Sequence, residues 1–399
     1  MLREKLKQAI QILGEKNIDM WLTFVRETEA VYDPCLDLIL GTNCTWQSAF
    51  IITRCGKTIA IVGSLDHERI HLTGLYQEIR KYVGSFKEEF LSALNELSPR
   101  NIAINTSKSD YMSDGLTHGM YQLLKEYTTN TEYHDRFISS QEIVSALRGR
   151  KTASEISRIK AAIQLTEDIY SQVSAYMLPG KSERDVAKYI LGLIKQNQVT
   201  TAWEENSCPA VFTGPDTAGA HADPTDRKIK KGHVLNIDFG VKKDEYCSDI
   251  QRTWYFLKDG ETQAPAEVQK GFNTIIEAVQ MAKDAIKPGK LGWEIDAIAR
   301  DYIISKGYPE YPHGLGHQVG RSTHDGAGLL GPRWERYGNV PYLPVEVGQV
   351  YTIEPRLPIE GYGVATVEEM IVVTKDGCEW LSHPQKEIFL IPSQIQWVK

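Results

Sequence analysis

Two acidic residues stand inside a predicted β-hairpin over residues 233–254 whose strands are otherwise mostly apolar. The strand before the turn carries Asp238, and the strand after it carries Asp249. If the turn centres between Lys243 and Asp244, the two aspartates face each other with their Cβ atoms about 4.5–5.5 Å apart. Because Asp is a poor strand residue, this placement makes the pair a candidate for a chemical use.

A second predicted hairpin repeats the arrangement over residues 350–374. Centred on Gly361, it places Glu354 opposite Glu368 inside another apolar pair of strands. Like charges directly opposite each other are destabilising, and burying them unpaired costs several kcal/mol per ion. Bound divalent cations would offset this cost. The alternatives are that the carboxylates face solvent, or that they pair with nearby lysines, Arg252 and Arg356.

Histidines gather near these hairpins in the sequence. His313, His317 and His324 fall within twelve residues of a glycine-rich segment, and His221 lies in a loop just before the first hairpin. A neutral imidazole is a common metal ligand and also a proton shuttle near neutral pH. Three histidines beside two carboxylate hairpins predict a site rather than isolated surface residues.

The rest of the chain predicts two domains around this chemistry. Residues 1 to about 145 alternate helical and strand patterns, with an amphipathic helix over 1–13, a strand over 19–24 and a hairpin over 48–62. We expect a small α/β domain over residues 1–147 and a catalytic domain over 148–399.

The second domain contains a candidate internal repeat. A long helix from Ser154 ends at Pro179-Gly180 and a second helix starts near Ser182, and the same helix, Pro-Gly break and helix recur 109 residues later at Pro288-Gly289. A duplication explains this pattern, and chance recurrence of a common helix-break dipeptide is the alternative.

Composition excludes several classes of protein. The 399 residues are 42% hydrophobic and 24% charged with a formal net charge of −7, which argues against collagen, disorder and nucleic-acid binding. We find no run of about 18 apolar residues and no signal-peptide pattern. The six cysteines form no C-x-x-C pair, so we expect reduced thiols and a cytoplasmic protein.

The motifs resemble those of the creatinase, prolidase and aminopeptidase P group, the M24-type metallopeptidases with the two-domain pita-bread fold. The resemblance covers residues 145–390 well and 1–145 in outline. It is carried by Asp238-Phe-Gly, Ser248-Asp249-Ile-Gln-Arg-Thr, His313-Gly-Leu-Gly-His317, Thr352-Ile-Glu354-Pro and Val367-Glu368-Glu. It implies an α/β (α+β) protein whose C-terminal pita-bread domain contains a pseudo-twofold repeat.

The resemblance also implies a role for each site residue. Asp249 and Glu368 would bridge two metal ions, and Glu369 would not be a ligand. Catalytic roles in substrate contact and proton transfer fall to His221, His313 and His324, with Glu354 as both ligand and proton acceptor. The full set of implied metal ligands is Asp238, Asp249, His317, Glu354 and Glu368.

Two positions depart from the family pattern. The family usually has arginine where this chain has Thr366, and glycine where this chain has Arg356. Because the predicted register places these two residues opposite each other, we interpret the departures as a swap that keeps one cation near the site.

The function implied is hydrolysis of Xaa-Pro bonds in short peptides, of the aminopeptidase P or prolidase type, by a hydroxide shared between two metals. A mostly oxygen ligand shell suits manganese first, with cobalt, zinc or iron as alternatives. A homodimer is expected from the resemblance. The competing interpretations are a metal-dependent hydrolase or lyase of a small non-peptide metabolite on the same fold, and a silent binding protein, which the intact ligand set disfavours.

Overall fold

The computed structural model describes residues 1–217 and 222–393. The chain divides into two compact units, Met1–Arg148 and Gly149–Lys399. No helix in the described part of the chain combines the length and the apolar character needed to cross a membrane.

The first unit is built on one six-stranded sheet with the strand order β4-β3-β2-β1-β5-β6. β2 is antiparallel to both of its neighbours, and the other strands all run in the same direction. The strands are β1 (Met20–Val25), β2 (Ser48–Thr53), β3 (Thr58–Gly63), β4 (Glu78–Tyr82), β5 (Ile102–Ile104) and β6 (Phe137–Ser139). The strand and the hairpin predicted in this region are confirmed as β1, β2 and β3.

Helices cover both faces of this sheet and give it two apolar cores. One core packs side chains of α1, α2, α3 and α6 against the sheet, and the other packs those of α4 and α5. The predicted amphipathic first helix is confirmed, since it buries Leu6, Ala9 and Leu13. The helices are α1 (Leu2–Glu15), α2 (Leu36–Ile39), α3 (His67–Thr73), α4 (Phe86–Leu97), the short 3-10 helix η1 (Tyr111–Ser113), α5 (His118–Tyr127) and α6 (Gln141–Gly149).

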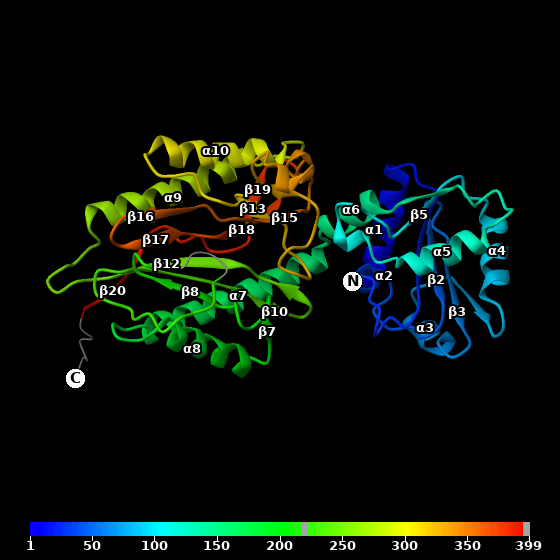
Figure 1. The fold of residues 1–399 in the computed structure, drawn as a ribbon, viewed down its shortest axis with the longest axis horizontal. Coiled ribbons are helices and arrows are strands. Elements are labelled where there is room, and N and C mark those ends of the chain that lie inside the picture. The colour runs from blue at the N-terminus through cyan, green and yellow to red at the C-terminus, as the bar shows by residue number, and fades with distance from the viewer. Residues whose placement is uncertain (218–221, 394–399) are drawn as a thin grey trace. The chain divides into compact units, whose positions relative to one another are not determined.

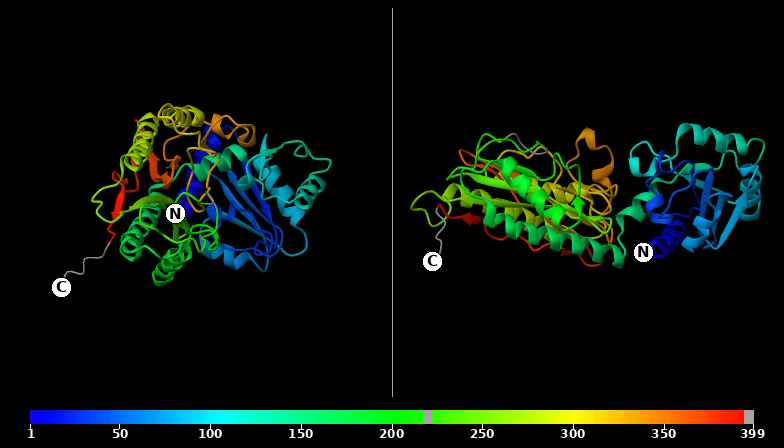
Figure 2. Two further views of the ribbon diagram at one scale, coloured as in Figure 1. Left: turned by 60° about the vertical axis from the view of Figure 1, so that its left-hand side comes forward. Right: turned by 90° about the horizontal axis from the view of Figure 1, so that it is seen from below.

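The second unit has strands enclosed between two pairs of helices, α7–α8 on one side and α9–α10 on the other (Figures 1 and 2). Its helices are α7 (Ala153–Tyr176), α8 (Glu183–Gln196), α9 (Ala266–Ala285) and α10 (Gly292–Ser305), with the short helices η2 (Glu335–Tyr337) and η3 (Val340–Tyr342). Its strands are β7 (Thr200–Thr201), β8 (Ala210–Thr213), β9 (Val234–Phe239), β10 (Val241–Lys243), β11 (Tyr246–Cys247), β12 (Ile250–Phe256), β13 (Gly316–His317), β14 (Leu329–Leu330), β15 (Val350–Ile353), β16 (Arg356–Ile359), β17 (Gly363–Thr366), β18 (Glu369–Val373), β19 (Cys378–Trp380) and β20 (Phe389–Ile391).

The two helix pairs are joined in the same way, which supports the predicted duplication. Gly180 and Gly289 both have positive φ, 95° and 89°, a conformation that favours glycine. The N–H of Gly180 donates to the carbonyl of Ile229, and the N–H of Gly289 donates to that of Val345. Each break is therefore tied to the chain that leads into a long hairpin, β9–β12 or β15–β18.

Side chains on the inner faces hold each helix pair to its strands. In the second half, α9 and α10 pack with β15–β18 in one apolar core that includes Phe272, Ile275, Ile295 and Ile353. In the first half, Tyr170 of α7 donates its hydroxyl to the carbonyls of Ile237 and Ile250, 2.9 and 2.7 Å away. These contacts fix both hairpins, from which the acidic residues project.

Candidate metal centre and active site

The second unit contains a cavity of about 420 Å³. Its walls come from both long hairpins and from the glycine-rich segment around β13. Seven of the eight residues singled out from the sequence line it, and His221 lies outside the described residues. The seven are Asp238, Asp249, His313, His317, His324, Glu354 and Glu368.

The first hairpin places its two aspartates diagonally, and the predicted direct pairing is wrong. Asp238 faces Gln251, because the strands turn at Asp244 and Glu245 rather than between Lys243 and Asp244. Asp244 and Glu245 both have positive φ, 49° and 71°, which is typical of the two-residue turn that suits hairpin twist. The register moves by two residues, so Asp249 stays on the same face as Asp238.

Asp249 sits at an interruption in this hairpin, between β11 and β12. On the other strand of the hairpin, Gly240 separates β9 from β10. A Cβ atom at Gly240 would stand 1.7 Å from the carbonyl oxygen of Ser248. Only glycine allows this approach of the two chains. The interruption brings Asp249 into the cavity at the end of β12.

The second hairpin follows the predicted register, with Ile353 opposite Glu369 and Arg356 opposite Thr366. Each long strand is broken at its glutamate: Glu354 separates β15 from β16, and Glu368 separates β17 from β18. Pro355 has no N–H to give to a ladder, which accounts for the first break. The breaks turn both carboxylates toward the cavity instead of leaving them on a regular sheet face.

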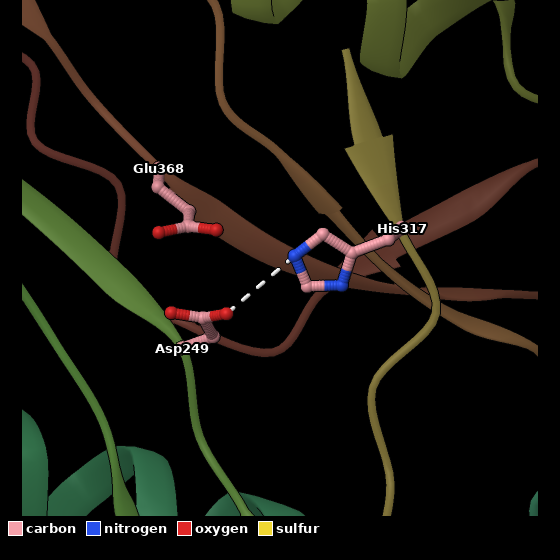
Figure 3. Close-up of side chains that lie close together, drawn as sticks. All are labelled: Asp249, His317 and Glu368. Atoms are coloured by element: carbon pink, nitrogen blue, oxygen red, sulfur yellow. Dashed lines mark ion pairs between the residues drawn. The ribbon is translucent and has the colours of Figure 1, made fainter. Parts of the chain in front are cut away.

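His317 completes the group from the short strand β13. The preceding Gly316 packs so closely on Thr352 that a Cβ atom there would stand 1.9 Å from its carbonyl oxygen. His317 Nε2 lies 3.6 Å from Asp249 Oδ2 and 3.2 Å from Glu354 Oε1. Ligand atoms of Asp249, His317 and Glu368 all fall within 4.8 Å of one another, and their side chains converge (Figure 3).

The carboxylates of this group have no arginine or lysine partner among the described residues. Arg252, an alternative partner, instead forms a buried ion pair with Glu369, with Nη1 3.0 Å from Oε1. Glu369 also accepts hydrogen bonds from Ser382 and Gln385, on the face away from the cavity. Its position agrees with its exclusion from the ligand set.

Several buried oxygen atoms of the carboxylate cluster lack hydrogen-bond partners, which indicates whether metal ions would fit there. Both carboxylate oxygens of Glu368 and Oδ1 of Asp238 are buried and have no hydrogen-bond partner in the described structure. Leaving buried acceptors unsatisfied is costly, and a cation would satisfy them. Four carboxylates and one imidazole form a ligand set suited to manganese, iron, cobalt or zinc, so the residues present fit such ions.

Burial and mutual repulsion change the pKa values of the clustered carboxyl groups. Burial raises the pKa of the Asp238, Asp249 and Glu368 carboxyls well above the ordinary range, and the charge of neighbouring carboxylates raises it further. Burial also acts to raise the pKa of Glu354, but the hydrogen bond from His317 and the nearby imidazoles lower it overall. Glu354 is therefore the carboxylate that most favours the ionised form.

The other two described histidines flank this group. His324 stacks edge-on against His317, with ring centroids 4.3 Å apart. His313 lies in a segment anchored to α10, where Arg300 donates to the His313 carbonyl and Asp296 accepts from the N–H of Leu315. Burial lowers the pKa of His313, which favours a neutral ring.

Among the cavity residues that the sequence reasoning missed, Gln251 contacts a candidate ligand directly. Its Nε2 donates to Glu354 Oε2 at 3.4 Å, and its Oε1 accepts from Thr366 Oγ1 at 2.9 Å. It was missed because the predicted register placed Asp249 opposite Asp238. The correct register, with Gln251 in that place, would have identified it.

Known proteins are similar to this chain in sequence and in fold. Residues 157–375, which contain all five candidate ligands, match metallopeptidase family M24. An uncharacterized peptidase of Staphylococcus aureus is 30% identical over 339 residues, covering 85% of this chain and 88% of that protein. The chain belongs to metallopeptidase family M24.

Solved structures place the whole chain within the fold of this family. An Xaa-Pro dipeptidase from Bacillus anthracis is 26% identical with a TM-score of 0.74, and the alignment covers 98% of this chain and 100% of that one. A prolidase from Pyrococcus horikoshii is 25% identical with a TM-score of 0.68, covering 97% and 100%. This M24 peptidase is thus a hydrolase with an N-terminal α/β domain and a pita-bread domain. M24 peptidases are typically metal-dependent.

Proposed function

We propose that this M24 peptidase hydrolyses the bond before proline in short peptides, as an Xaa-Pro dipeptidase or aminopeptidase P. The observation that carries the proposal is the cluster of four carboxylates around His317 in a cavity of about 420 Å³. This volume lies within the range of about 300–1,000 Å³ that is typical of small-ligand sites. The likeness to the B. anthracis and P. horikoshii enzymes supports proline as the residue after the cut.

The proposed site holds two divalent ions, with manganese as first choice and cobalt, zinc or iron as alternatives. Asp249 and Glu368 would bridge them, and the full ligand set is Asp238, Asp249, His317, Glu354 and Glu368. Divalent ions in such a site polarise a carbonyl group and make water more acidic.

The remaining chemistry falls to side chains of this chain. Glu354, held by hydrogen bonds from Gln251 and Thr352, would accept a proton from the attacking water at its carboxylate. His313 or His324 would donate a hydrogen bond to the developing oxyanion, or a proton to the leaving nitrogen. His221 is proposed to contact the substrate.

Apolar side chains in the cavity suit a proline ring. Phe212, Leu329 and Val364 line the cavity together with the polar group. An apolar wall with a few placed polar groups is typical of sites for small ligands. These side chains would pack against the pyrrolidine ring and exclude water from the bond that breaks.

Substrate comparison tests this proposal. Metal-loaded protein should hydrolyse Ala-Pro or Ala-Pro-Ala at the bond before proline, and Ala-Ala at least about tenfold more slowly. Absence of turnover on every peptide, in protein shown to hold metal, would contradict the proposal and favour a hydrolase or lyase of a small non-peptide metabolite. Light scattering on the same sample would test the proposed homodimer.

A further inference from the structure

One positively charged side chain stands in the cavity apart from the acidic group. Arg356 begins β16 directly opposite Thr366 and lines the cavity. Among the described residues that line the cavity, it is the single arginine or lysine. The cavity therefore combines an acidic centre with one guanidinium.

The guanidinium of Arg356 has no hydrogen bond or ion pair to any described residue. Buried arginines elsewhere in this unit are paired: Arg252 with Glu369, and Arg300 with Asp296. A partly buried guanidinium keeps five N–H donors that need acceptors. Its fork geometry matches a carboxylate, which it can bind through two parallel hydrogen bonds.

The neighbouring side chains leave this guanidinium available. Thr366, across the hairpin, donates its hydroxyl to Gln251. Gln251 in turn donates to Glu354, which also accepts from His317. These polar groups are thus engaged with one another, and the Arg356 guanidinium is available to an acceptor on a bound molecule.

The spacing from Glu354 to Arg356 suits a dipeptide. Two residues along extended chain span about 6–7 Å, and both side chains line the same cavity. In a dipeptide, three bonds separate the scissile carbonyl carbon from the carboxylate carbon, a distance of under about 4 Å. Each further residue moves that carboxylate about 3.3–3.6 Å away.

We propose that Arg356 binds the free α-carboxylate of the substrate and selects dipeptides over longer or amidated peptides. This inference rests on the proposed Xaa-Pro peptidase function and names its substrate class. Arg356 would act as a specificity residue, because it contacts the end of the substrate and not the bond that breaks.

Hydrolysis of Ala-Pro and of its amide, Ala-Pro-NH₂, tests the proposal in metal-loaded protein. A charged hydrogen-bonded pair should give wild type about a 10- to 100-fold preference in kcat/KM for the free acid. Arg356→Gln should bring the ratio close to 1, mainly through a higher KM for Ala-Pro. Arg356→Lys keeps the charge without the fork, so its preference should be intermediate.

Arg184→Gln is the matched control. Arg184 is exposed, pairs with Asp226 and lies outside the cavity, so its loss should leave the preference unchanged. Equal cleavage of acid and amide by wild type would overturn the proposal, as would a preference that survives in metal-loaded Arg356→Gln.

Calorimetry separates this inference from the proposed function. If neither peptide is hydrolysed, the Xaa-Pro function fails, and binding of free proline against prolinamide still tests Arg356. Tighter binding of proline in wild type, lost in Arg356→Gln, supports the carboxylate contact. Equal binding of the two compounds overturns it.

Discussion

Gln251 Nε2 donates a hydrogen bond to Glu354 Oε2 across 3.4 Å, which joins the first carboxylate hairpin to the second. The contact matters because Glu354 is the proposed proton acceptor and metal ligand. Gln251 is itself held by Thr366 Oγ1. Its amide therefore orients the Glu354 carboxylate instead of taking part in the reaction.

Replacing Gln251 with methionine should keep the shape of the side chain and remove both hydrogen bonds. These hydrogen bonds favour the correct orientation of Glu354 by about 1–1.5 kcal/mol. Their loss should lower kcat/KM about tenfold and leave the metal content unchanged. Gln164→Met is the control, because Gln164 is exposed and bonds only Asp168 on its own helix. Steady-state kinetics in which both variants match wild type would remove Gln251 from the account.

Glu368→Gln should have opposite effects on the metal-free and the metal-loaded protein. Both carboxylate oxygens are buried without a partner, and folding raises the pKa of this acid, so replacing it with a neutral amide should stabilise metal-free protein at pH 7 by about 1–3 kcal/mol. The same change removes a proposed bridging ligand, so added manganese should stabilise the variant much less than wild type. Urea unfolding with and without manganese measures both effects, and equal manganese stabilisation in the two proteins would rule out the bridging role.

The histidines should divide into one ligand and two catalytic side chains. His317→Gln should reduce the amount of bound metal, because the His317 ring lies among the clustered carboxylates. His313→Gln and His324→Gln should retain metal and lower kcat by about 10²–10⁴-fold, the usual contribution of a proton-transfer group. Metal analysis and kinetics on the same preparations check this division. Metal loss in His313→Gln, or full kcat in both variants, would contradict it.

Asp19 gives a prediction on stability in the N-terminal unit. Paired hydrogen bonds from Arg100 lower the pKa of Asp19 to about 2, against the opposing effect of burial. Because the pKa is depressed on folding, the stabilisation is present above about pH 4 and is lost as the pH falls toward 2. Asp19→Asn should cost about 1 kcal/mol at pH 7 after allowance for the exposed arginine.

Urea unfolding at several pH values measures that cost. The difference between wild type and Asp19→Asn should shrink between about pH 4 and pH 2. Asp135→Asn is the control, because Asp135 is 90% exposed and its pair with Lys125 should contribute almost nothing. A difference that does not depend on pH would assign the effect to packing rather than to charge.

The gathering of the carboxylates and histidines at one cavity could be predicted from the sequence, because it depends on residue types in two hairpins and one glycine-rich segment. The second register was predicted correctly from a turn centred on Gly361, and Arg356 does face Thr366. The first register was wrong by two residues. Asp244 and Glu245 adopt positive φ without the glycine or asparagine that normally signals such a turn.

Other features depend on contacts between distant segments. The side chain of Gln251 reaches Glu354 from another hairpin, and Tyr337 lines the cavity from a short helix without periodicity. From the sequence, Arg252 was an alternative partner for the candidate ligand carboxylates. In the structure it pairs with Glu369, which also accepts hydrogen bonds from Ser382 and Gln385. Local pattern cannot encode such relationships.

The central claim is that Asp238, Asp249, His317, Glu354 and Glu368 hold two metal ions that make this chain an Xaa-Pro peptidase. Titration of manganese into metal-free protein, with bound metal and Ala-Pro hydrolysis measured in the same samples, tests it most directly. The account predicts no hydrolysis without metal, full rate at two ions per chain, and neither second ion nor full rate in Asp249→Asn. Hydrolysis without metal, or wild-type rate and two ions in Asp249→Asn, would contradict it.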